Sequence, residues 1–291
     1  MSRRVGLCGF GYWGKNLARC FNDLGVLKVI YDFNMVPRDR AREAYLHVDV
    51  RPTYDGIDFE GVDSIVVATP PQTHYDIARL ALNAGKDVFI EKPMTTSSAD
   101  AESLVKQARA QGRNLMVGHI YLHNEGIKRM PVPVGKAELY VQLLNEGGAP
   151  SESTRDMAWA GLPHACSLAL HFFPDWPDVI EAEIDGDRIK ACLRYWNGSE
   201  AYLDVGDNTG RKLRRVELRI QNSRYLFDVA RHEGVTLISG TDITSFGFGQ
   251  DQKEVEPLKV ECKAFLEYQG VDLMGPKVVK LIEEILDGCD P

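Results

Sequence analysis

The chain is predicted to be an α/β protein in two parts, a doubly wound parallel sheet and then an α+β domain with an open, mostly antiparallel sheet. In the first part, apolar strand segments alternate with helical ones, and the segment 64–68 is apolar on both faces, as buried parallel strands are. In the second part, turns such as Asp185-Gly186 and Asn197-Gly198 divide short alternating segments. We place the domains at residues 1–119 and 120–291, with the C-terminal helix a candidate to pack back on the first.

The individual elements follow from the same patterns. In the first domain we expect strands near 3–8, 26–31, 63–68, 87–91 and 114–118, and helices near 13–24, 38–46, 74–84 and 98–111. In the second we expect strands near 136–144, 179–184, 187–195, 200–206, 213–220, 225–229 and 235–238, and helices near 164–173, 257–269 and 274–287.

Composition limits the function classes. The 291 residues are 44% hydrophobic and 26% charged, which is typical of a globular protein. A net charge of −8 without a block of Lys or Arg argues against nucleic acid as a partner. The sequence shows neither a leader pattern nor a long apolar run, so we expect no association with a membrane. Six scattered cysteines without a C-x-x-C pair favour a reducing cytoplasm, and we expect no metal site.

A glycine-rich turn stands between the first strand and the first helix. Its pattern, G-x-G-x-x-G, is typical of a dinucleotide-binding turn in a Rossmann domain, where the helix N-terminus faces the phosphates. Trp13 either covers the cofactor or packs. The candidate cofactor contacts of this turn are Gly9, Phe10, Gly11, Tyr12, Trp13 and Gly14.

An acidic residue follows the second strand. Asp32 stands 18 positions after Gly14 and suits the ribose hydroxyls of an NAD-type cofactor. Its charge would repel a 2′-phosphate, although Arg38 and Arg40 lie nearby. NAD(H) is therefore favoured, NADP(H) stays possible, and the alternative is a plain strand, turn and surface Asp.

Three further motifs end predicted parallel strands: Ala68–His74, Glu91–Met94 and Gly118-His119. In order with the glycine turn, they resemble the Gfo/Idh/MocA family, NAD(P)-dependent oxidoreductases that act mostly on sugars and cyclitols. The resemblance covers the first 120 residues densely and the rest thinly. It implies a second domain whose open sheet pairs with another subunit. Because an exposed sheet face needs cover, we expect a homodimer or homotetramer.

The resemblance also implies residue roles. Lys92, in the E-K-P motif, would hold the reacting hydroxyl or carbonyl and move its proton, and the Lys92–Pro93 bond is a candidate for cis. Three roles stay open: His74 contacts the cofactor or packs, Glu91 binds it or orients the lysine, and His119 lies at the cleft floor or is structural. The further cofactor contacts implied are Thr69, Pro70, His74, Glu91, Lys92, Pro93 and His119.

In the second domain, Trp159–His164 resembles the W-x-x-x-P-H stretch of the branch that acts on nucleotide-linked sugar acids. His164 matches the acid/base histidine and binds substrate in this interpretation, as does Arg155 through a carboxylate or phosphate. The usual carboxylate positions hold Ala160 and Ala165. Asp156 lies about 12 Å away along a continuous helix, too far to replace them. Later, 257–265 resembles the P-L-x-x-E-x-x-x-F helix of the same branch.

Three functions follow from these residues. The favoured one is an NAD(P)-dependent oxidoreductase of a ring hydroxyl or keto group of a sugar, with a nucleotide-linked sugar first. The alternatives are a catalytically impaired dinucleotide-binding sensor or regulator on the same fold, motivated by Ala160 and Ala165, and an oxidoreductase of a small non-sugar substrate.

Overall fold

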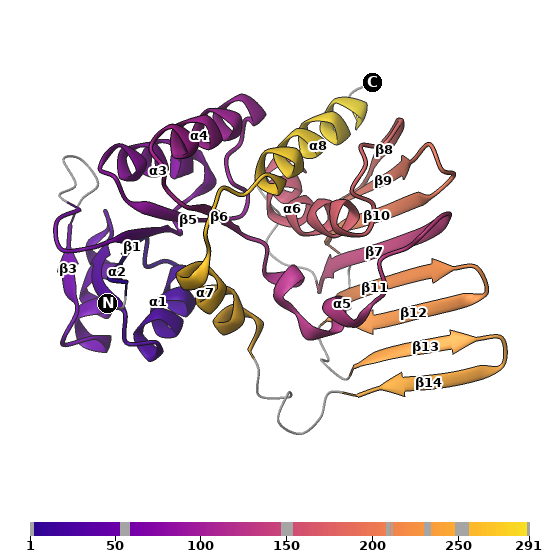
Figure 1. Cartoon of the computed structure of the whole chain (residues 1–291), viewed down its shortest axis with the longest axis horizontal. Helices are drawn as coiled ribbons and strands as arrows, with labels where there is room; N and C mark the ends of the chain where they lie inside the picture. The colour runs from indigo at the N-terminus through magenta and orange to yellow at the C-terminus, as the bar shows by residue number, and fades with distance from the viewer. Residues whose placement is uncertain are drawn as a thin grey trace. The chain divides into compact units, whose positions relative to one another are not determined.

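The chain divides into two compact units (Figure 1). The first comprises Met1–Gly118 and Leu258–Val279, and the second comprises His119–Pro257 and Lys280–Pro291. The computed structural model describes residues 3–52, 59–146, 154–207, 210, 212–229, 234–247 and 256–289, without the side chains of 154–157.

The first unit is built on a parallel sheet with the strand order β3-β2-β1-β4-β5-β6. The order reverses at β1 and β4, and ligands of open α/β sheets bind beside the carboxyl ends of such strands. The predicted Rossmann domain is thereby confirmed, with β3 as a strand that the sequence patterns missed. The strands are β1 (Val5–Cys8), β2 (Leu27–Tyr31), β3 (Asp49–Arg51), β4 (Ser64–Val67), β5 (Asp87–Glu91) and β6 (Leu115–Gly118).

Helices cover this sheet. On α1, the buried Leu17, Ala18 and Phe21 recur at helical spacing and pack toward β1 and β2. The late helix α7 joins the same core, because the ring of Phe265 lies 6.3 Å from Phe21 and 5.5 Å from Phe89. The helical elements are α1 (Gly14–Asp23), α2 (Met35–Ala44), η1 (Pro71–Thr73), α3 (His74–Asn83), α4 (Ser98–Ala110) and α7 (Pro257–Glu267).

The second unit holds an eight-stranded sheet in the order β14-β13-β12-β11-β7-β10-β9-β8 (Figure 1). Its pairs are antiparallel except that β7 and β10 run parallel, so the predicted mostly antiparallel sheet is confirmed. The strand β14 was not predicted. The strands are β7 (Ala137–Asn145), β8 (Val179–Asp185), β9 (Arg188–Arg194), β10 (Glu200–Asp207), β11 (Leu213–Ile220), β12 (Ser223–Asp228), β13 (Val235–Ser239) and β14 (Asp242–Phe246).

One face of this sheet is covered by α6, which packs on β10 and β7. This helix spans Thr154–Phe172 and contains Pro163, so it begins ten residues before the predicted helix at 164–173. The remaining elements are η2 (Ile120–His123), α5 (Glu125–Arg129) and α8 (Met274–Cys289). Within the described ranges, no helix has the length and apolar character that a membrane span requires.

Candidate functional site

The glycine-rich turn is shaped by close backbone contacts. A Cβ on Gly9, whose φ is +96°, would lie 2.6 Å from the Ala68 carbonyl oxygen, and one on Gly14 would lie 2.0 Å from the Gly9 carbonyl oxygen. A Cβ on Gly11 would meet nothing within 4 Å. Gly9 and Gly14 are therefore required by the fold, whereas Gly11 borders open space.

That open space is a pocket of about 680 Å³, lined by the turn and by the residues that follow β2 and β4. Its walls include Gly11, Asp32, Thr69 and Pro70, which the sequence predicted as cofactor contacts. The first turn of α1 carries no acidic side chain, so its N-terminus is suited to phosphate groups. The residues present fit a dinucleotide.

Asp32 is 5% exposed and holds the turn in place. Its Oδ2 accepts the backbone N–H of Phe10 at 2.7 Å, and its Oδ1 accepts that of Asn34 at 2.8 Å. The Nη1 of Arg38 donates to the carbonyl oxygens of Asp32, Phe33 and Pro52. This nitrogen is therefore engaged in hydrogen bonds to the backbone.

His74 joins the ends of two strands. It is 1% exposed, and its Nδ1 and Nε2 lie 2.8 Å from the carbonyl oxygens of Pro93 and Thr69. Burial lowers the pKa of His74 against the opposing effect of the two carbonyls. Both ring nitrogens therefore face backbone carbonyls, one from the Thr69 loop and one from the Pro93 loop, and a neutral ring donates a hydrogen bond to only one of them.

Glu91 connects the glycine turn to the Lys92 loop. Its Oε1 accepts the indole N–H of Trp13 at 2.5 Å, and its Oε2 accepts the backbone N–H of Lys92 at 3.1 Å. The Lys92–Pro93 bond is cis, as expected. Burial raises the pKa of Glu91 to about 7, against the Lys92 charge and the two hydrogen bonds, which lower it. The sequence offered Trp13 and Glu91 as separate candidates and missed their pairing.

In the second unit, His164 on α6 stacks on Tyr121 of η2, with ring centroids 4.6 Å apart and planes at 16°. Burial raises the pKa of Tyr121, although its hydrogen bond to the Arg214 side chain and that cation's charge lower it. Arg214 is anchored on the Leu144 carbonyl oxygen at 2.6 Å. Tyr121 was missed, and its one sequence signal is its place two residues after His119 of the Gly118-His119 motif.

The other predicted residues of this unit are His119, Arg155 and Asp156. His119 is 4% exposed at the start of η2. Because α6 is continuous, the separation of about 12 Å between Asp156 and His164 stands. The side chains of Arg155 and Asp156 lie outside the described residues. Among the described side chains, no group of His, Cys, Asp and Glu could hold a metal ion.

The reversed strand order, the glycine turn and the pocket beside Asp32 define a nucleotide-binding Rossmann unit. Residues 3–119 match the Gfo/Idh/MocA oxidoreductase family, described as an NAD-binding Rossmann fold. This match covers most of the first unit, which has the fold and the pocket of an NAD-binding Rossmann domain.

Relatives of known name are similar over parts of the chain. UDP-N-acetylglucosamine 3-dehydrogenase of Acidithiobacillus ferrooxidans is 32% identical over 119 residues, 40% of this chain and 37% of that one. Inositol 2-dehydrogenase 1 of Saccharopolyspora erythraea is 28% identical over 232 residues, 78% of this chain and 63% of that one. The match thus spans less than two thirds of either relative.

A solved structure of the A. ferrooxidans enzyme resembles the whole fold. It superposes with a TM-score of 0.89 at 20% identity, covering 100% of this chain and 98% of that one. This similarity supports the two-part architecture, including the antiparallel sheet of the second unit.

Proposed function

We propose that the protein is an NAD-dependent oxidoreductase that transfers a hydride between nicotinamide and a ring hydroxyl or keto group of a sugar, with nucleotide-linked sugars as the substrate class. The observation that carries this proposal is the hydrogen-bonded link from the glycine turn through Glu91 to Lys92. A proton-transferring lysine is thereby tied to the cofactor turn. The similarity to a UDP-sugar dehydrogenase and to an inositol dehydrogenase supports the substrate class.

NAD is favoured over NADP by two features of the pocket. The Asp32 carboxylate lines it, and a negative charge there repels a 2′-phosphate. Arg38, the nearby cation, directs one guanidinium nitrogen to backbone carbonyls. The remaining cofactor contacts of the proposal are Thr69, Pro70, Pro93 and His119, and His74 supports the Thr69 and Pro93 loops.

Lys92 and His164 are the proposed proton carriers. Oxidation of an alcohol removes a hydride to nicotinamide and a proton from the hydroxyl, so a base must take that proton. Lys92 is half-buried, and His164 is held by ring stacking on Tyr121. Arg155 is the proposed partner of the substrate's anionic group, through its bidentate guanidinium.

The test is Lys92→Ala, with Lys106→Ala on the exposed side of α4 as the control. Both variants are titrated with NADH and assayed against sugars and nucleotide-linked sugars by the reduced-nicotinamide absorbance. Loss of turnover only in Lys92→Ala, with NADH binding kept, is the expected result. Turnover close to that of the parent protein would refute the role of Lys92.

A dinucleotide-binding sensor is the second candidate, because the carboxylate positions around His164 hold Ala160 and Ala165. Ala165 is fully buried, so a carboxylate there would lie in the core. NADH binding without turnover of any sugar would favour this candidate. Turnover of an imine or another small molecule with inert sugars would favour a non-sugar substrate.

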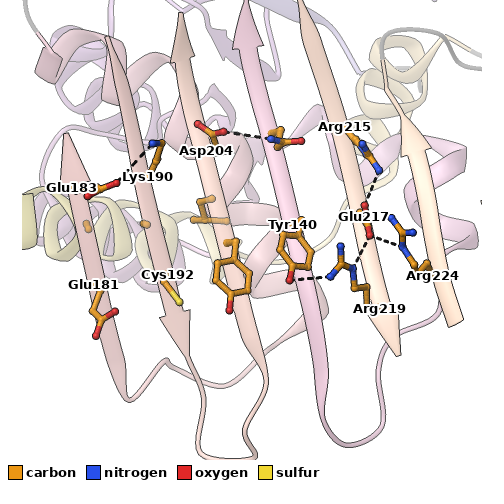
Figure 2. A pocket seen from close by; sticks show the side chains of 15 residues that line it. Tyr140, Glu181, Glu183, Lys190, Cys192, Asp204, Arg215, Glu217, Arg219 and Arg224 are labelled. Atoms are coloured by element: carbon orange, nitrogen blue, oxygen red, sulfur yellow. Dashed lines mark hydrogen bonds and ion pairs between the residues drawn. The ribbon is translucent and has the colours of Figure 1, made fainter. Parts of the chain in front are cut away.

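We propose that the assembly is a homodimer through the sheet face shown in Figure 2, which is hollowed by about 690 Å³. Glu181 and Glu183 lie toward the β8 edge, whereas Arg215, Arg219 and Arg224 surround Glu217 toward β12. A two-fold axis between the two faces and parallel to the strands would set each edge of the sheet against the opposite edge of its partner.

Light scattering after size exclusion tests this arrangement. Arg219→Glu should yield monomers, and Arg219→Glu with Glu181→Arg should restore dimers. A dimeric Arg219→Glu protein would refute the interface. The described cysteines form no disulfide, which suits the proposed cytoplasmic location.

A further inference from the structure

Two buried carboxyl groups, Glu261 on α7 and Glu91 on β5, lie close enough to influence each other electrostatically. Glu261 and Phe265 are four residues apart on α7, about 6 Å along its axis. Phe89 and Glu91 are two residues apart on β5, about 6.6 Å. Because the Phe265 ring contacts the Phe89 ring at 5.5 Å, the next pair in this register is Glu261 and Glu91. Glu261 is 0% exposed and Glu91 is 7% exposed.

Burial raises the pKa of Glu91 to about 7, and its hydrogen-bond partners and the Lys92 charge oppose that effect by favouring the ionised form. Its two oxygens accept the Trp13 indole N–H and the Lys92 backbone N–H, and the charge of Lys92 acts in the same direction. Its side chain lies over the neighbouring strand, where a Cβ on Gly118 would come within 3.2 Å of Oε1. The carboxylate is therefore fixed at one position.

The surroundings of Glu261 favour its neutral form. Burial, followed by the Glu91 carboxylate and then Cys20, raises the pKa of Glu261 well above its usual range. The Cys20 and Cys262 thiols lie beside each other near this carboxyl, and their hydrogen bond, followed by burial, raises the pKa of Cys262. Two carboxylates so placed cannot both be charged at modest cost.

We propose that Glu261 is a positioning residue that stays protonated, so that the buried pair carries one negative charge and Glu91 holds it between Trp13 and Lys92. The consequence for catalysis rests on the proposed function of Lys92. The protonation state of Glu261 is independent of that function, because it depends only on the residues of α7, β5 and the cofactor turn.

Cofactor binding should respond to the charge of Glu91. When Glu91 gains a proton, its bonds from Trp13 and Lys92 lose the added strength of an ionic acceptor, so the two loops are held less firmly. A neutral Glu261 leaves the pKa of Glu91 unaltered, whereas an ionised Glu261 would raise that pKa further.

The first test measures the proton on Glu261 in the ligand-free protein. Urea unfolding is compared for the parent protein and Glu261→Gln from about pH 5 to about pH 9, with Glu267→Gln on the exposed side of α7 as the control. In this window the folded state keeps a proton that the unfolded state loses, so stability of the parent falls as pH rises. The ratio of the two unfolding constants should grow by up to about tenfold per pH unit. Parallel curves for Glu261→Gln and Glu267→Gln would overturn the proposal.

The second test measures position, through NADH fluorescence titrations over the same pH range. The parent protein and Glu261→Gln should lose affinity several-fold on acidification with the same midpoint, and Glu91→Gln should show no such midpoint. A midpoint that falls by a pH unit or more in Glu261→Gln would show a charged Glu261 and overturn the proposal. Neither test requires a sugar substrate, so both can be interpreted even if no turnover is found.

Discussion

Substituting two glycines of the same turn should have opposite effects. In Gly14→Ala the new Cβ would lie 2.0 Å from the Gly9 carbonyl oxygen, a backbone atom that cannot rotate away. In Gly11→Ala the new Cβ meets nothing within 4 Å, and Gly11 is not among the glycines with positive φ. The methyl group of Gly14→Ala therefore disrupts the fold, whereas that of Gly11→Ala enters only the proposed phosphate site.

The magnitudes follow from these contacts. Relieving a contact more than 1 Å too short needs a backbone shift, so Gly14→Ala should lower the free energy of unfolding by about 3 kcal/mol or more. Gly11→Ala should raise it by about 0.4–1 kcal/mol, because alanine has less conformational freedom in the unfolded chain. Its methyl group would keep a pyrophosphate from the backbone, and NADH affinity should fall by about tenfold to hundredfold, or about 1.4–2.7 kcal/mol.

Urea unfolding and NADH fluorescence titration measure the two quantities separately. Gly11→Ala that binds NADH as tightly as the parent protein would refute the interpretation of the pocket as the phosphate site. Gly14→Ala with unchanged stability would refute the close helix-to-turn packing.

Three further outcomes are expected. Gly118→Ala should lower the unfolding free energy by about 1–3 kcal/mol in urea titrations, because its Cβ would lie 2.8 Å from the Phe89 ring. Asp32→Asn should improve NADPH affinity relative to NADH by about tenfold in paired titrations, because it removes the charge that opposes a 2′-phosphate; an unchanged ratio would contradict this. For Glu217, burial is outweighed by its arginine partners, which lower its pKa, so the parent protein should exceed Glu217→Gln in stability by about 1 kcal/mol at neutral pH. That difference should vanish as pH falls through the lowered pKa, since the protonated side chain loses its ion pairs.

The sequence predicted elements whose signal is local. The strand–turn–helix at Gly9–Gly14 and the doubly apolar β4 needed no distant partner to be recognised. The strand β3 carried too little pattern, because it has three residues and pairs with the more distant β2. The strand β14 pairs with β13 directly before it, but all five of its residues are exposed, so it lacks the alternation that marks a half-buried strand. The helix predicted near 164–173 begins ten residues earlier, because α6 runs through Pro163, as tertiary packing can stabilise a helix across a proline.

The partners of the site residues could not be predicted from the sequence either. Motif spacing indicated Asp32, Glu91 and Lys92 one by one, but a hydrogen bond such as that from Trp13 to Glu91 joins residues 78 positions apart. Likewise, a carboxylate near His164 was sought one helical turn away, and the structure instead stacks Tyr121 against that ring from another element. Sequence periodicity cannot reveal such partners, because it reports neighbours only on one helix or strand.

The stacked pair bears on the choice between an enzyme and a sensor. A carboxylate partner would fix the tautomer of His164 and stabilise its cation, whereas an aromatic face can stabilise a cation without accepting its proton. Tyr121→Phe preserves the face and breaks the link to Arg214, while Tyr121→Leu removes both. If His164 works as an acid/base group on this support, turnover of the sugar substrate should fall far more in Tyr121→Leu than in Tyr121→Phe, with NADH affinity unchanged in both. Equal losses in the two variants would assign the contribution to the Arg214 link and refute support by stacking.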